Sequence, residues 1–137
     1  HIHNVYKPRS PLADMQIPFA ASLIRLLEDS QLARPDVEVV SCGSWMNSTP
    51  RFAELFPEFW PTSAVSRNEI NYTMGHWGQF EDRKGDYHSR NGDRFRKTGE
   101  LPFAATNCHA HVDEVLDHLR RRFPEAIEYN QSLPTGD

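Results

Sequence analysis

The sequence predicts an α/β or α+β domain in which a small mixed sheet with a βαβ unit is packed by two or three amphipathic helices. Three observations predict this class. A β-branched run at Val37, Val39 and Val40 is typical of a buried strand. Apolar residues recur at helical spacing over residues 19–27 and again over 112–123. The chain has 137 residues, which is long enough for one domain with a hydrophobic core. We place this single domain at residues 1–130 and expect a frayed tail at residues 131–137.

The composition argues against nucleic-acid and membrane partners. The net charge is -4, and the basic runs at 94–97 and 120–122 lie beside acidic residues at expected helix ends, where the helix dipole accounts for them. The longest apolar stretch, residues 17–27, is interrupted by Pro18, Ser22 and Arg25. Two cysteines are too few for a disulfide scaffold. We therefore expect a reduced, cytoplasmic protein whose partner is a small-molecule substrate.

The first part of the chain predicts a βαβ unit. Alternating side chains in residues 1–6 predict a strand. Pro18 marks the start of a helix expected over residues 18–31. The strand that begins at Val37 follows. Strand, helix and strand within about forty residues predict two parallel strands joined by a right-handed crossover.

Four further elements are expected along the rest of the chain. They are a short helix that starts at Thr49 and Pro50, a strand at residues 69–80, a helix at 87–98 that ends at Gly99, and a helix at 108–123. Thr106 or Asn107 would cap the last helix, and Cys108 would belong to its apolar stripe.

A candidate site lies where the strand at Val37 ends in small, polar and reactive side chains. Ligands in open α/β sheets bind beyond the carboxyl ends of strands. We expect three catalytic residues, His3, Cys42 and His76, because a histidine beside a cysteine can activate its thiolate as a nucleophile. The expected substrate-binding residues are Asn4, Ser44, Trp45, Asn47 and Trp77.

A metal site is the alternative. Residues two apart on a strand face the same way, so His1 and His3, with His76, would hold zinc, copper or iron. On the last helix, His111, Glu114 and His118 follow an i, i+3, i+7 spacing that suits either metal ligands or a solvent-facing stripe. His109 and His111 would point apart there, because they are two residues apart on a helix.

One stretch resembles a known family. His3 lies near a strand end, a helix follows, and Cys42-Gly-Ser-Trp45 comes after a hydrophobic strand, before Leu55-Phe-Pro57. This order resembles the α/β domain associated with GNAT-type acyltransferases, where a strand-helix-strand unit leads into a Cys-x-Ser-Trp motif and a Leu-x-Pro segment. The resemblance covers about residues 1–60, and the chain shows no acetyl-CoA pyrophosphate loop. It implies acyl-type chemistry.

Three functions follow from these patterns. The first is a small-molecule transferase, hydrolase or lyase that uses histidine acid–base chemistry, with Cys42 as a nucleophile, on an acyl or similarly polarised substrate. The second is a metal-dependent enzyme with histidine ligands. The third is a non-catalytic ligand-binding or interaction domain, within a longer chain or in a homodimer. Phe56, Phe59 and Trp60 would serve either in the core or in that dimer contact.

Overall fold

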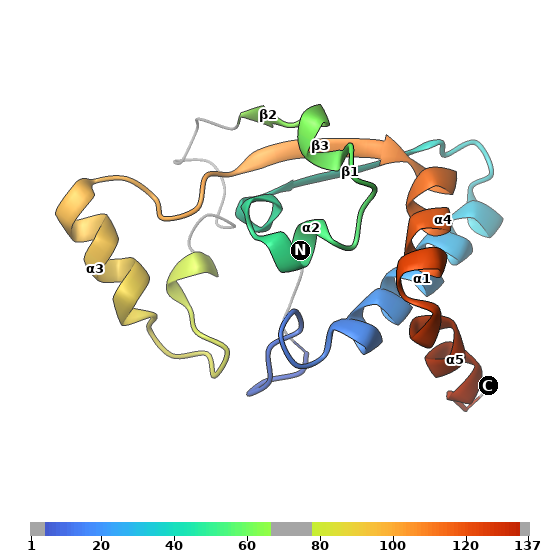
Figure 1. Ribbon diagram of the computed structural model, residues 1–137, viewed down its shortest axis with the longest axis horizontal. Helices are drawn as coiled ribbons and strands as arrows, with labels where there is room; N and C mark the ends of the chain where they lie inside the picture. Colours follow the sequence, from blue (N-terminus) through green and yellow to red (C-terminus); the bar gives the residue numbers. More distant parts are fainter. Residues whose placement is uncertain (1–4, 67–77, 135–137) are drawn as a thin grey trace.

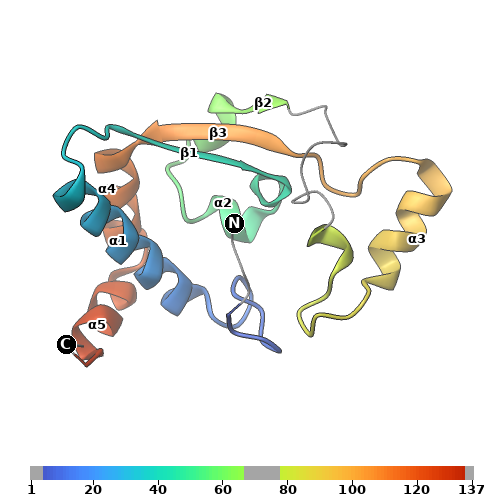
Figure 2. The same ribbon diagram turned by 180° about the vertical axis from the view of Figure 1, so that it is seen from behind.

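Helices pack beneath a small antiparallel sheet in the computed structural model, which describes residues 5–66 and 78–134 (Figure 1). The sheet has the order β1-β3-β2, with β1 at Val39–Ser44, β2 at Val65–Ser66 and β3 at Thr106–His111. Helices α1 (Gln16–Ala33), α4 (Val112–Arg122) and α5 (Pro124–Ser132) gather at one end, and α3 (Ser89–Thr98) lies at the other (Figure 2). The α/β or α+β class is confirmed.

The expected parallel pairing is not formed by the residues that the structure describes. Strand β1 pairs antiparallel with β3, and β2 also pairs antiparallel with β3. The predicted strand at residues 1–6 overlaps the described chain only at Val5 and Tyr6, which lie in a turn. Helix α1 therefore leads into β1, but the partner of β1 comes from the far end of the chain.

The predicted helix over residues 108–123 is a strand followed by a shorter helix. In β3, Cys108 and Ala110 are buried while His109 and His111 are exposed. The prediction that these two histidines point apart is therefore wrong, because side chains two apart on a strand share a face. Helix α4 begins at Val112 and is capped by His111, whose Nδ1 accepts the backbone N–H of Asp113. Thr106 and Asn107 are strand residues.

Helices α1, α4 and α5 enclose the core on one face of the sheet. Val115, Leu116 and Leu119 of α4 are buried. Polar contacts fix the helices to one another: Gln31 Nε2 donates to Asp113 Oδ1 at 2.8 Å, and Asn130 Nδ2 donates to the carbonyl of Ala21 at 3.0 Å. Helix α5 reaches Ser132, so it includes the first two residues of the expected tail.

Short helical turns connect β1 to β2. They are η1 (Trp45–Ser48), α2 (Pro50–Ala53) and η2 (Trp60–Ser63). The rings of Phe56 and Trp60 stack with centroids 4.0 Å apart, and both side chains are buried, whereas Phe59 is 42% exposed. Phe56 and Trp60 are thus core residues, which leaves Phe59 as the one exposed member of this aromatic group.

The second predicted strand, at residues 69–80, lies mostly outside the described residues. Its last three residues, 78–80, form a 3-10 turn. Helix α3 follows and ends at Gly99, as predicted, with a φ of 70° that a glycine adopts without strain. No helix in the described part of the chain is long and apolar enough to cross a membrane.

Candidate functional site

The predicted site residues fall into two groups. His1, His3, Asn4, His76 and Trp77 lie outside the described residues. The other four lie together at the end of β1 and in η1: Cys42, Ser44, Trp45 and Asn47.

Asn47 uses its whole side-chain amide to hold the sheet to the helical turns. Its Nδ2 donates to the carbonyls of Cys42 at 3.0 Å and Thr106 at 2.9 Å, which belong to β1 and β3. Its Oδ1 accepts the indole N–H of the buried Trp60 at 3.0 Å. Ser44 is used locally as well, because its Oγ accepts the backbone N–H of Met46. These contacts indicate structural roles, and a role for either residue in substrate binding stays a prediction.

Trp45 is half-buried against an aromatic neighbour. Its ring centroid lies 5.6 Å from that of Phe103. Gly78 approaches the same indole, since a Cβ on Gly78 would lie 3.3 Å from Trp45 Nε1. Trp45 at the start of η1 therefore contacts both Phe103 and the backbone at Gly78.

The described surroundings of Cys42 do not favour its thiolate. Burial raises its pKa, and the neighbouring Cys108 raises that pKa further. The side chain is therefore a neutral thiol at neutral pH, whereas nucleophilic cysteines have lowered pKa values. Its assignment as a nucleophile stays a prediction, because both of its expected histidine partners are outside the described residues.

The expected metal pattern on the last helix does not form a site. Among residues 5–66 and 78–134, no three His, Cys, Asp or Glu side chains cluster closely enough to hold a metal ion. His111 is the cap of α4, and His118 bonds to the backbone of a different element. The i, i+3, i+7 spacing assumed one continuous helix, and the strand at residues 106–111 removes its first position from that helix.

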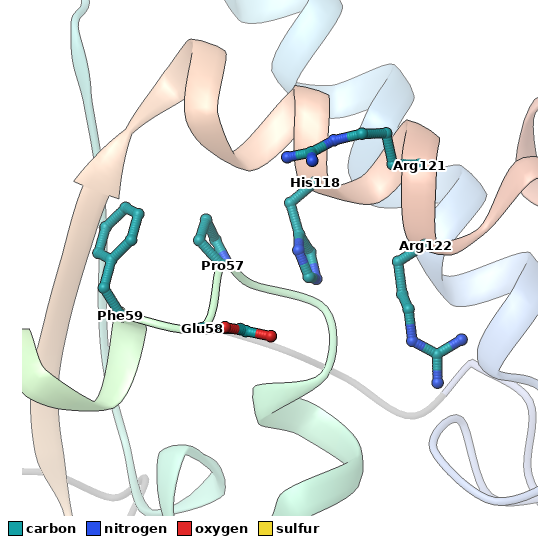
Figure 3. Close-up of a pocket in the computed structure, with 6 residues that line it drawn as sticks. All are labelled: Pro57, Glu58, Phe59, His118, Arg121 and Arg122. Carbon is teal, nitrogen blue, oxygen red and sulfur yellow. The ribbon is translucent and has the colours of Figure 1, made fainter.

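A solvent-open hollow lies beside α4, between this helix and the turn that follows α2 (Figure 3). Its volume is about 510 Å³. We call it the α4 hollow, and it is lined by Pro57, Glu58, Phe59, His118, Arg121 and Arg122.

Helical spacing brings the three α4 residues to this hollow. Residues three and four apart share one side of a helix, so Arg121 and Arg122 follow His118 on the same side. Leu116, two residues before His118, lies on the opposite side of α4 and is buried. Pro57 is buried and prevents the helical turns after α2 from continuing. The next two residues, Glu58 and Phe59, are exposed to solvent.

His118 is held by a hydrogen bond to the backbone. Its Nε2 lies 2.8 Å from the carbonyl oxygen of Glu54. A carbonyl only accepts, so in the neutral imidazole Nε2 carries the proton and Nδ1 is the acceptor. The half-buried imidazole extends from α4 into the α4 hollow (Figure 3). The hydrogen bond orients the ring through Nε2, and Nδ1 takes no part in that bond.

The guanidinium groups of the α4 hollow have solvent-exposed contacts: Arg121 Nε donates to the Asp117 carbonyl at 3.4 Å, and Arg122 lies over the Phe123 ring at 5.2 Å. Arg121 contacts Asp117 at 3.0 Å and Arg122 contacts Glu54 at 3.9 Å, in pairs whose side chains are largely or partly exposed. Such surface pairs are worth roughly 0–1 kcal/mol, so a ligand can replace them. Glu58 is exposed and makes no hydrogen bond or ion pair with any residue that the structure describes.

Sequence reasoning singled out one residue of the α4 hollow as a possible ligand and gave the two arginines no binding role. His118 stood out through its spacing on the helix, but Arg121 and Arg122 were explained by the helix dipole. The hollow depends on a turn at residues 57–59 meeting a helix about sixty residues later in the chain. No local pattern signals that contact.

Comparison of the chain with protein-family models, curated proteins and solved structures finds no match in any of the three.

Proposed function

We propose that this protein is a ligand-binding domain that holds a small zwitterionic molecule, of the amino-acid type, in the α4 hollow. The observation that carries the proposal is the placement of both signs of charge around one hollow: Arg121 and Arg122 on α4, and Glu58 on the opposing turn. The arginines would bind a carboxylate and Glu58 would bind an ammonium group.

The size and walls of the hollow suit such a ligand. Small-molecule sites occupy roughly 300–1,000 Å³, and the α4 hollow falls within that range. A guanidinium presents paired N–H groups that match a carboxylate. Phe59 and Pro57 supply an apolar wall for the rest of the molecule. A ligand with only one charged group would contact either Glu58 or the arginines, but not both.

A second function, histidine acid–base chemistry, is supported by His118. The bond from Nε2 to the Glu54 carbonyl orients the ring and leaves Nδ1 to accept a proton from a bound molecule. The enzyme would then be a transferase, hydrolase or lyase whose base is His118. Acyl-type chemistry, a role for His3, Cys42 and His76, and a cytoplasmic location stay predictions from the sequence.

The binding proposal is tested by mapping the ligand on the folded chain. We would titrate isotope-labelled protein with L-phenylalanine, acetate and methylammonium, and follow the backbone amide signals. The proposal expects L-phenylalanine to shift the signals of residues 57–59 and 118–122 at lower concentration than either fragment. Equal responses to all three probes, or shifts confined to other parts of the chain, would contradict it.

Arg120 offers a matched control for this experiment. It neighbours Arg121 on α4 but points toward α1, where its guanidinium lies 3.7 Å from Glu28. Arg121→Gln and Glu58→Gln should each weaken the response to L-phenylalanine, whereas Arg120→Gln should leave it unchanged. If binding is proven, turnover assays with His118→Gln test the second function.

A further inference from the structure

The two cysteines of the chain are partners across the sheet. Cys42 of β1 and Cys108 of β3 are directly opposite in the antiparallel register. Residues in opposed positions project from the same face. Cys108 is 1% exposed, while Cys42 is half-buried and packs against the same core. Both thiols are free.

The spacing of this pair suits a covalent bond. Opposed residues of an antiparallel pair have Cα atoms about 4.5 or 5.5 Å apart, depending on the type of pair. Disulfides join Cα atoms that are usually about 4.4–6.8 Å apart, so either type of pair allows the bond. The two side chains already share one face of the sheet at directly opposed positions.

We propose that Cys42 and Cys108 form a reversible cross-strand disulfide by exchange with a small-molecule disulfide such as oxidised glutathione. Cys42 reacts first because it is the more exposed thiol. Its thiolate attacks one glutathione sulfur, the glutathione S–S bond breaks, and one glutathione leaves as a thiol. Cys108 then attacks the Cys42 sulfur and releases the second glutathione. The protein loses two electrons and two protons, and glutathione disulfide gains them.

The bond would tie the two strands together beside the Asn47 contacts. Asn47 bonds to the carbonyl of Cys42 itself, so the disulfide and the amide act on the same end of β1. Burial raises the pKa of the Cys42 thiol, which lowers the thiolate fraction at neutral pH and slows the exchange. The pair would therefore respond to sustained oxidation, and faster at mildly alkaline pH.

The test follows the folded full-length chain in glutathione buffers of increasing oxidised fraction. After free thiols are blocked, intact mass and non-reducing digestion are recorded. The proposal expects a mass lower by two hydrogen atoms, a linked peptide pair that contains Cys42 and Cys108, and full reversal by a dithiol reductant. Cys108→Ser should stop at a glutathione adduct on Cys42.

Two results would overturn the proposal. One is wild-type protein that accumulates glutathione adducts without closing the bond. The other is folded protein that keeps both thiols in buffers where the urea-unfolded chain closes the disulfide. If Cys108→Ser fails to fold, the linked peptide from the wild-type chain decides the question alone.

Discussion

The indole N–H of Trp60 donates to the side-chain oxygen of Asn47 at 3.0 Å, and this bond joins the buried aromatic core to the end of the sheet. The amide nitrogen of Asn47 completes the connection by donating to carbonyls of β1 and β3. One side chain thus satisfies polar groups from three elements.

Replacing Asn47 with alanine should destabilise the fold. The substitution leaves the buried indole N–H and two strand carbonyls without their partner, and each unsatisfied buried group costs about 1–3 kcal/mol. Because water can reach part of this site, we expect a loss of roughly 2–4 kcal/mol in the free energy of unfolding, measured by urea titration. Asn107→Ala, at an exposed position of β3, is the matched control. Equal stability of both variants would show that Asn47 is not structural.

Replacing Gly99 with alanine should weaken the end of α3. Gly99 has a φ of 70°, and a Cβ there would meet no other atom within 4 Å, so the cost comes from the backbone alone. Left-handed conformation costs an ordinary residue roughly 1–2 kcal/mol. Hydrogen exchange of the α3 amides should therefore quicken by about tenfold in Gly99→Ala. Gly99→Asn should show a smaller change, and the same change in both variants would contradict this explanation.

The thiol of Cys42 should make stability depend on pH in the alkaline range. Its pKa is raised in the folded chain by burial and by Cys108, so the unfolded chain loses this proton first as pH rises. The unfolded state is then favoured, and the free energy of unfolding should fall from the ordinary thiol pKa, about 8.5, upward. Urea titrations at several pH values check this, with reductant present. Cys42→Ala should remove part of the slope, and an unchanged slope would contradict the assignment.

The imidazole of His118 should carry its proton on Nε2. This nitrogen lies 2.8 Å from the Glu54 carbonyl, which can only accept. Nitrogen chemical shifts of the ring, measured at a pH where the imidazole is neutral, distinguish the two tautomers. A proton on Nδ1 would show that the ring is not held by Glu54, and it would remove the basis for His118 as a base.

Local signals in the sequence predict several helices well. The apolar spacing after residue 19 predicts α1 within two residues at each end, and the pair Thr49 and Pro50 marks the start of α2. Gly99 marks the end of α3. In each case, the residues that determine the element lie within it or beside it.

The sheet could not be predicted in the same way, because its pairing is not local. Cys108 lies four residues before Val112, so it extends the apolar stripe of α4 backward and hides the alternation of β3. The pairing of β3 with β1 joins residues about seventy positions apart. The predicted helical arrangement of His109 and His111 failed for this reason.

The candidate site depends on the same kind of distant contact. The sequence points to the end of β1, and there Asn47 and Ser44 already use their polar groups within the fold. The α4 hollow exists only because the turn at residues 57–59 lies against α4. The sequence shows that Arg121 and Arg122 are positively charged, but it does not show that Glu58 lines the same hollow.

The most direct test of the central claim is calorimetric titration of L-phenylalanine into wild-type, Arg121→Gln and Arg120→Gln protein. The account predicts binding to wild type, affinity about tenfold weaker in Arg121→Gln, and wild-type affinity in Arg120→Gln. Equal weakening by both substitutions would assign the effect to general charge. Undiminished binding by Arg121→Gln would contradict a ligand site in the α4 hollow.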